Sequence, residues 1–138
     1  MLPADHFVAT LNLDVRYVET DAMRIVHHST YIIWMEAARV HYLRQRNTPY
    51  ENMEKAGLGL PVAEIHAKYI SSVHFGDTVT IHCWVSELKS RAMKFQYQIT
   101  NMQNNALIVT GESLHICINT EGKATIIPSE WKEKWLPL

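Results

Sequence analysis

The stretch YVETDAMRIVHHSTY, residues 17–31, stands between a predicted strand and a predicted long helix. It carries two carboxylates, Glu19 and Asp21, followed by the adjacent histidines His27 and His28. Titratable side chains at the junction of two elements are typical of a functional site, because catalytic residues often lie on loops that a rigid scaffold positions. A polar turn has the same composition, so the neighbouring elements must decide between the two interpretations.

The residues before this stretch, 7–17, alternate between apolar and polar side chains, which predicts a half-buried strand. The residues after it, from Ser29 or Thr30 to about Arg46, predict a helix with Ser29 as its N-cap. The first half of this helix is apolar on almost every side. We therefore expect the helix to be buried.

The rest of the chain has a short helix and then alternates with a period of two. The sequence TPYE, residues 48–51, predicts this helix, with Thr48 as its cap and an end near Gly57. Gly111 is a candidate bulge in a later strand. The closing sequence PSEWKEKWL predicts a helical turn. The predicted strands, separated by turn residues, are 63–69, 79–85, 93–99, 107–118 and 124–127.

One strand, one long buried helix and a run of strands predict a single α+β domain over residues 1–138. The short connections between alternating strands indicate an antiparallel sheet. A single helix has to cover one face of that sheet, so we expect a curved antiparallel sheet wrapped round the helix.

The composition excludes several partners. The chain has 138 residues, a hydrophobic fraction of 47% and a formal net charge of −1. No overall field would attract nucleic acid or an anionic membrane, with a local basic patch as the alternative, and we expect no nucleic-acid partner. The sequence has no signal-peptide pattern and no run near the ~20 apolar residues of a membrane span, which favours a cytoplasmic protein.

The cysteines and histidines indicate neither a metal nor a cofactor. Cys83 and Cys117 each lie in an alternating apolar run. This predicts buried free thiols in a reducing compartment, with a disulfide as the alternative. His27 and His28 are adjacent and have no third ligand at helical or hairpin spacing, which makes a poor metal site.

The order of these elements and motifs resembles a known family. A strand, then YVETDAMRIVHHSTY, then a buried helix with WMEAAR, then AKYISSVHFGDTVTI, is similar to the hotdog-fold acyl-CoA thioesterases over nearly the whole chain. More narrowly, the chain resembles the 4-hydroxybenzoyl-CoA thioesterase group and the related short-chain acyl-CoA thioesterases associated with the Tol–Pal system. The spacing of Tyr17, Asp21 and His28, with Glu36 and Arg39 on the helix, carries this resemblance.

The resemblance implies that Asp21 is catalytic and that the backbone N–H of His28 polarises the thioester carbonyl. An aspartate can attack a thioester or activate a water, and a helix N-terminus stabilises the negative charge that develops on the carbonyl oxygen. The choice between these two roles of Asp21 stays open, as does a role for the His28 side chain. The family often has small residues after the aspartate. This chain has Ala22, Met23 and Arg24, which bears on how open the loop is and which acyl group fits beside it.

Three further side chains have more than one interpretation. Tyr17 either orients Asp21 or a water through its hydroxyl, or simply ends the strand. A helix glutamate is the catalyst in another branch of hotdog thioesterases, but we favour an i,i+3 ion pair of Glu36 with Arg39. Glu19 is expected to be a solvated acid at the strand end.

The resemblance also implies an acyl-CoA substrate, and the phosphates of coenzyme A need a basic, exposed site. Lys89 and Arg91 at a predicted hairpin tip offer one, with an ordinary solvated turn as the alternative. The family builds its site between protomers, so we expect a homodimer or homotetramer, which would also cover open sheet edges. The alternative functions are a hotdog hydratase or dehydratase and a non-catalytic acyl-CoA-binding module.

Overall fold

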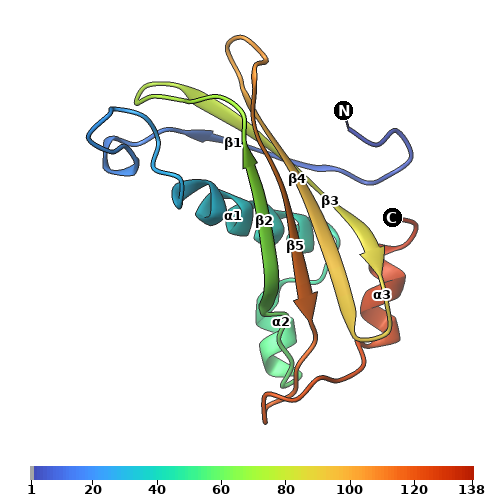
Figure 1. Ribbon diagram of the computed structural model, residues 1–138. Coiled ribbons are helices and arrows are strands. Elements are labelled where there is room, and N and C mark those ends of the chain that lie inside the picture. Colours follow the sequence, from blue (N-terminus) through green and yellow to red (C-terminus); the bar gives the residue numbers. More distant parts are fainter. Residues whose placement is uncertain (1) are drawn as a thin grey trace.

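The computed structural model describes residues 2–138 and shows one curved antiparallel sheet with a long helix on its concave side (Figure 1). The strand order is β1-β3-β4-β5-β2. The predicted α+β architecture is therefore confirmed. The strands are β1 (Ala9–Asp14), β2 (Val62–Tyr69), β3 (Thr78–Leu88), β4 (Ala92–Asn101) and β5 (Leu107–Ile116). The helical elements are η1 (Tyr17–Glu19, a 3-10 turn), α1 (Thr30–Gln45), α2 (Tyr50–Lys55) and α3 (Ser129–Trp135).

The alternation in β3, β4 and β5 separates a buried concave face from a half-buried outer face. Helix α1 covers the concave face with Trp34, Met35 and Ala38, none of them more than 3% exposed. Removing this apolar surface from water is the main favourable contribution to folding, at roughly 25 cal/mol per Å². Cys83 and Cys117 are buried in this interior as free thiols, as the sequence predicts.

Gly111 is not the predicted bulge, because it pairs in register with Tyr97 of β4 and Ala67 of β2. A Cβ atom at Gly111 would collide with the Met35 side chain of α1. Glycine here therefore lets the helix lie close to the sheet. The register shifts are found at Val62/Glu64, Val85/Glu87 and Ile99/Thr100.

Two predicted helix caps have other partners. Ser29 precedes α1, but its side chain does not cap the helix and its Oγ lies 2.7 Å from His27 Nδ1. Thr48 does not cap α2, since its hydroxyl donates to the Leu43 carbonyl at 3.1 Å and accepts from the Trp135 indole N–H at 2.8 Å. Thr48 thus fastens α3 to the end of α1.

Helix α1 is buried on one side only, which corrects the expectation of a helix buried all round. Ile33 is 59% exposed and Glu36 is also exposed. The reason is geometric, since a single sheet can cover only one face of the helix.

The predicted strand at 124–127 is a single bridge between Ile118 and Ala124. The backbone N–H of Thr125 donates to Cys117, whereas that of Ile127 donates to Ser90. No ladder forms, because these two donors point to different segments of the chain.

Candidate active site

The loop between β1 and α1 is fastened by Glu19, which is buried and not solvated as predicted. Its carboxylate accepts the Arg16 backbone N–H at 2.8 Å and the Trp34 indole N–H at 2.9 Å. Burial alone would raise the pKa of Glu19, but these hydrogen bonds and the Arg16 charge outweigh it and lower the pKa. Glu19 therefore ties the loop to α1 as a structural anion.

Asp21 lies in a tight turn that uses one of its two carboxylate oxygens. Oδ1 accepts the Met23 backbone N–H at 2.8 Å, and the Asp21 carbonyl accepts the Arg24 N–H at 2.9 Å. Within residues 2–138, Oδ2 accepts no hydrogen bond. The turn thus orients the carboxylate and leaves one oxygen for chemistry.

The backbone at His28, just before α1, presents an N–H donor to the region around Asp21. The Tyr69 hydroxyl, at the end of β2, donates to the His28 carbonyl at 2.9 Å. The His28 N–H has no acceptor in the described part of the chain. An unpaired N–H at the start of a helix, where the dipole is positive, can hold an oxyanion.

Two cavities meet at Asp21. The first, the inner cavity, has about 210 Å³ and contains both Asp21 and His28. The second, the outer cavity, has about 520 Å³ and lies on the other side of the turn. The inner cavity is also lined by Met23, Ile25, Val26, Tyr31, Tyr69, Ser71 and Ser72. The outer cavity is lined by Tyr17, Thr20, Asp21, Arg24, His74 and Phe75.

Asp21 therefore shares one cavity with Tyr17 and the other with His28, and no hydrogen bond joins these three side chains in the described residues. Tyr17 lies in η1, beyond the strand end at Asp14, and is 76% exposed. Its ring packs edge-on against Phe75 at 5.7 Å between centroids, and no hydrogen bond joins it to Asp21 in the described residues. The His28 imidazole lies against that of His27, at 4.2 Å between centroids.

The structure does not bring Lys89 and Arg91 to Asp21 within one chain. The loop that carries Asp21 begins beside the start of β3, because the Val15 backbone N–H donates to the Asp77 carbonyl at 2.9 Å. Lys89 and Arg91 lie at the other end of this strand, at the β3–β4 hairpin tip. Since β3 has 11 residues, the two ends are about 35 Å apart.

The expected ion pair of Glu36 with Arg39 is not formed among residues 2–138. Glu36 is exposed on α1, whereas Arg39 is buried and donates to the Tyr97 hydroxyl at 3.1 Å. The two residues share a turn of the helix but point to different surroundings, so their i,i+3 spacing does not produce contact.

Arg39 begins a second polar cluster, which is buried between α1 and the sheet. The Tyr97 hydroxyl lies 2.6 Å from Ser113 Oγ, and Ser113 Oγ lies 2.7 Å from His115 Nε2. His115 Nδ1 is 2.9 Å from the Leu60 carbonyl, so it carries the proton and Nε2 is an acceptor. Burial lowers the pKa of His115 to about 4, so the imidazole is neutral.

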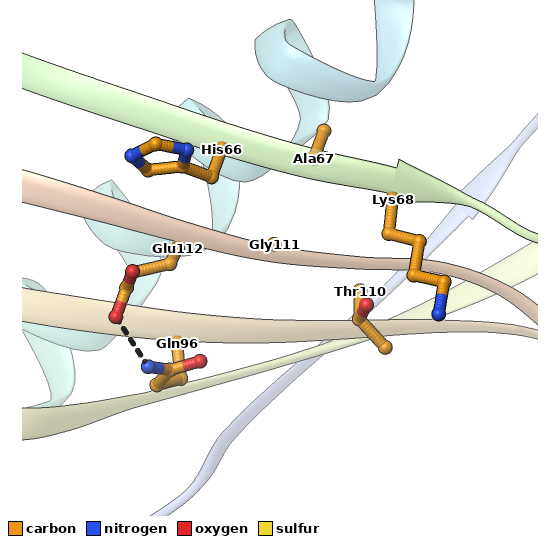
Figure 2. A pocket seen from close by; sticks show the side chains of 7 residues that line it. All are labelled: His66, Ala67, Lys68, Gln96, Thr110, Gly111 and Glu112. Atoms are coloured by element: carbon orange, nitrogen blue, oxygen red, sulfur yellow. Dashed lines mark hydrogen bonds between the residues drawn. The ribbon is translucent and has the colours of Figure 1, made fainter.

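A third polar group of residues lies on the outer face of the sheet, away from α1. Figure 2 shows His66 and Lys68 of β2 beside Thr110 and Glu112 of β5, around a depression of about 260 Å³. Gln96 of β4 donates to Glu112 at 2.9 Å. This depression contains neither Asp21 nor the start of α1 and plays no part in the site described above.

Residues 2–138 contain no group of three or more His, Cys, Asp or Glu side chains arranged to hold a metal ion. No helix in that range is long and apolar enough to cross a bilayer.

Sequence reasoning missed two residues that position the site. Tyr69 has no marker in the sequence, because it is simply the last residue of an alternating strand, and only the fold brings it to His28. Glu19 has a weak marker, since it lies three residues after Arg16 and so could pair with it. Its bond to Trp34 spans 15 positions and follows from the tertiary structure alone.

A family profile, sequence relatives and a solved structure all relate this chain to thioesterases. The profile of the "Thioesterase-like superfamily" matches residues 15–136. YneP of Bacillus subtilis, whose name assigns it provisionally to the acyl-CoA thioesterases, is 34% identical over 83% of this chain and 82% of its own. The acyl-CoA thioesterase YbgC of Haemophilus influenzae is 28% identical over 86% of this chain and 87% of its own. The structure of DHNA-CoA thioesterase from Staphylococcus aureus superimposes with a TM-score of 0.88 at 28% identity, covering 93% of this chain and 88% of that one.

Proposed function

Since the chain belongs to the thioesterase-like superfamily, we propose that it hydrolyses an acyl-CoA to the free acid and coenzyme A, with Asp21 as nucleophile or general base. One observation carries the assignment of residues: Asp21 and His28, which lies two residues before α1, line the same cavity. The spacing of Tyr17, Asp21 and His28 further supports a place near the 4-hydroxybenzoyl-CoA and short-chain acyl-CoA thioesterases.

The reaction follows from these two groups. The unbonded Oδ2 of Asp21 either attacks the thioester carbon or takes a proton from the water that attacks it. Negative charge then develops on the carbonyl oxygen, and the His28 N–H at the positive end of α1 stabilises it. One such donor is typically worth about 3 kcal/mol. Tyr69 acts as a positioning residue, because its hydroxyl holds the His28 carbonyl, on the peptide group next to the one that carries the His28 N–H.

When the negative charge returns to the carbonyl, the C–S bond breaks and coenzyme A leaves as a thiolate. If Asp21 is the general base, the proton that it took from water passes to the thiolate. If Asp21 is the nucleophile, the thiolate is protonated by solvent, and water hydrolyses the resulting anhydride to restore the Asp21 carboxylate.

We also propose that two copies pair through β2. This strand is an edge of the sheet and most of its residues are exposed, so its outer backbone groups can accept a second strand. A twofold axis would place the start of the partner's β2 beside Tyr69. Within a chain, Val62 and Met93 both pair with His115, so the hairpin tip lies at the start of β2.

The same pairing would move the hairpin tip of the second copy to the Asp21 end of the first. Lys89 and Arg91 of one protomer would then serve the phosphates of a coenzyme A bound at the other. The assembly is accordingly a dimer, or a tetramer built from such dimers. The free Cys83 and Cys117 thiols support a cytoplasmic location.

The test is release of free thiol from a panel of acyl-CoAs of different chain length and ring content, followed with a thiol reagent. A thioesterase releases one thiol per acid formed. A hydratase alters enoyl-CoAs without releasing thiol, and a binding module does neither. The wild-type protein should release thiol from at least one member of the panel, and failure with all of them would remove the proposal.

A further inference from the structure

Arg24 has a backbone conformation that its side chain makes costly. It follows Asp21 by three positions, and its φ is 67°. The other non-glycine residues with positive φ in residues 2–138 are Asn47 and Asn105, and asparagine tolerates this region. For most other residues the left-handed conformation is strained, because the Cβ atom approaches the following carbonyl oxygen, a contact that glycine lacks. A residue kept under such strain beside a reactive group suggests that its side chain has a function.

The Arg24 side chain lines the outer cavity and has no bonding partner among the described residues. Its guanidinium forms no ion pair or hydrogen bond within residues 2–138. The walls include Tyr17 and Phe75, which form an edge-on aromatic pair and are 76% and 61% exposed. The other titratable side chains that line this cavity are Asp21 and His74, whose Nδ1 lies 3.7 Å from the Asp77 carboxylate.

The place of the outer cavity decides which part of a thioester it can hold. It lies between η1 and the turn before β3, whereas the inner cavity opens beside Tyr69 at the end of β2. The proposed partner and its basic hairpin tip lie beyond β2. A coenzyme A chain that runs from Asp21 to that hairpin tip passes along the inner cavity. The outer cavity then remains for the acyl group.

We propose that the outer cavity receives the acyl group and that Arg24 selects acyl groups with a carboxylate on an aromatic ring. This rests on the proposed thioesterase function. The Tyr17 and Phe75 rings favour another ring by edge-on or offset packing. A planar guanidinium binds a carboxylate with two parallel hydrogen bonds. Because Arg24 and Asp21 line the same cavity, the carboxylate is expected on the same ring that carries the thioester.

The test compares 4-carboxybenzoyl-CoA with 4-carbamoylbenzoyl-CoA, which have nearly the same shape and differ by one charge. The wild-type kcat/KM should favour the carboxylate about tenfold, a modest ratio because the two hydrogen bonds to Arg24 would form at a partly exposed site. Arg24→Gln should bring this ratio close to one, and Arg24→Lys should restore part of it. A wild-type ratio near one, or a ratio that Arg24→Gln does not change, would overturn the proposal.

Two variants separate this effect from damage elsewhere. Arg24→Gly removes the side chain and its strain, so it should lose the preference while its thermal midpoint stays equal or rises. Arg44→Gln, on the exposed face of α1, removes a cation outside the cavity and should keep the preference. If Arg24→Gln lowers kcat equally for both substrates, Arg24 acts on Asp21 and the proposal is wrong.

Binding gives the same comparison without turnover. In the Asp21→Asn variant, calorimetry should show about tenfold tighter binding of the carboxylate thioester, lost on adding Arg24→Gln. If this difference is found but no acyl-CoA is ever hydrolysed, Arg24 selectivity stands and only the proposed thioesterase function fails. If neutral acyl-CoAs are hydrolysed but the difference is absent, only the selectivity fails.

Discussion

The Asp21 loop and the buried Arg39–His115 cluster contain similar chemical groups in opposite conditions. At the loop, one carboxylate oxygen and one backbone N–H have no partner among residues 2–138, and both line a cavity. In the cluster, the Ser113 hydroxyl and His115 imidazole are 2.7 Å apart, like a nucleophile and its base. Both of these residues are fully buried, and their hydrogen-bonding groups are already used.

The difference shows that geometry between two side chains is not enough to identify a catalytic pair. A reacting group needs an unused lone pair or donor and a path for substrate. The loop has both, so its bonds with Glu19 and Met23 serve to position the reactive atoms. The Ser113–His115 pair has neither, because both side chains are fully buried and already hydrogen-bonded. Its hydrogen bonds, with that of Arg39 to Tyr97, serve to hold α1, the sheet and the Leu60 segment together.

The Asp21→Asn variant is the strongest test of the proposal that the loop, and not the buried cluster, is catalytic. The amide keeps the shape of the side chain but can neither attack the thioester nor take a proton from water. We expect kcat to fall at least about 10²-fold, the low end for losing a general base, with little change in the midpoint of thermal unfolding. Thiol release and calorimetric unfolding measure the two effects.

Glu36→Gln is the matched control for Asp21→Asn, because Glu36 is the exposed carboxylate on α1. Its turnover should stay close to that of the wild type. Loss of activity in folded Glu36→Gln, with near-normal turnover in Asp21→Asn, would move the chemistry from the loop to the helix.

Acid should weaken the buried cluster through His115. Its pKa falls from 6.5 to about 4 on folding, so the unfolded chain binds its proton first. The stability that neutral His115 provides is therefore complete above pH 6.5 and is lost as the pH falls toward 4. This shift corresponds to about 3 kcal/mol.

Denaturant unfolding at pH 7 and at pH 4.5 measures this loss. His115→Gln should be less stable at pH 7 and should show a smaller difference between the two pH values. The lowered pKa of Glu19 acts in a separate window, below its ordinary value of 4.5. An unchanged pH dependence in His115→Gln would show that the cluster does not carry this proton linkage.

Ser113→Ala asks whether the cluster has any part in turnover. It leaves the Tyr97 hydroxyl and His115 Nε2 without their partner, which should cost about 2 kcal/mol of unfolding free energy. The kcat of the folded variant should stay within about twofold of wild type. A large loss of kcat at full stability would make the buried pair catalytic after all.

The smallest expected effect concerns whether the site extends to the hairpin tip of a second protomer. Replacing Lys89 and Arg91 together by Glu should raise KM for an acyl-CoA several-fold and leave kcat mostly intact, because phosphate contacts are equal in the ground and transition states. Sedimentation should show a dimer or tetramer at micromolar concentration. An unchanged KM, or a monomer that is fully active, would confine the site to one chain.

Local patterns in the sequence were enough to predict most of the fold. The helix expected from Ser29 or Thr30 to about Arg46 is observed at Thr30–Gln45, because its length and apolar content are local properties. The alternating strands are found near the predicted positions for the same reason. The predicted closing turn is observed as α3.

Several errors have a different cause, because they depend on contacts between distant segments. The Thr48 hydroxyl is used by Trp135, 87 positions away, and the role of Gly111 is set by Met35 on α1. Burial of Glu19 depends on Trp34 in the same way. For the site, the position of Asp21 before the helix was predictable, whereas Tyr69 and the far location of the hairpin tip needed the sheet order.

The contact of Gly111 with Met35 also limits how the chain can evolve. A single added methyl group at position 111 would meet the Met35 side chain, so alanine there should be harmful alone. A smaller residue at position 35 would open the required space, and the two changes together should be tolerated better than the first by itself. Substitutions at these two positions should therefore be inherited in pairs, and the order of mutation decides which intermediate is viable: shrinking residue 35 leaves a cavity that a later methyl at 111 can fill, whereas the reverse order starts with a clash.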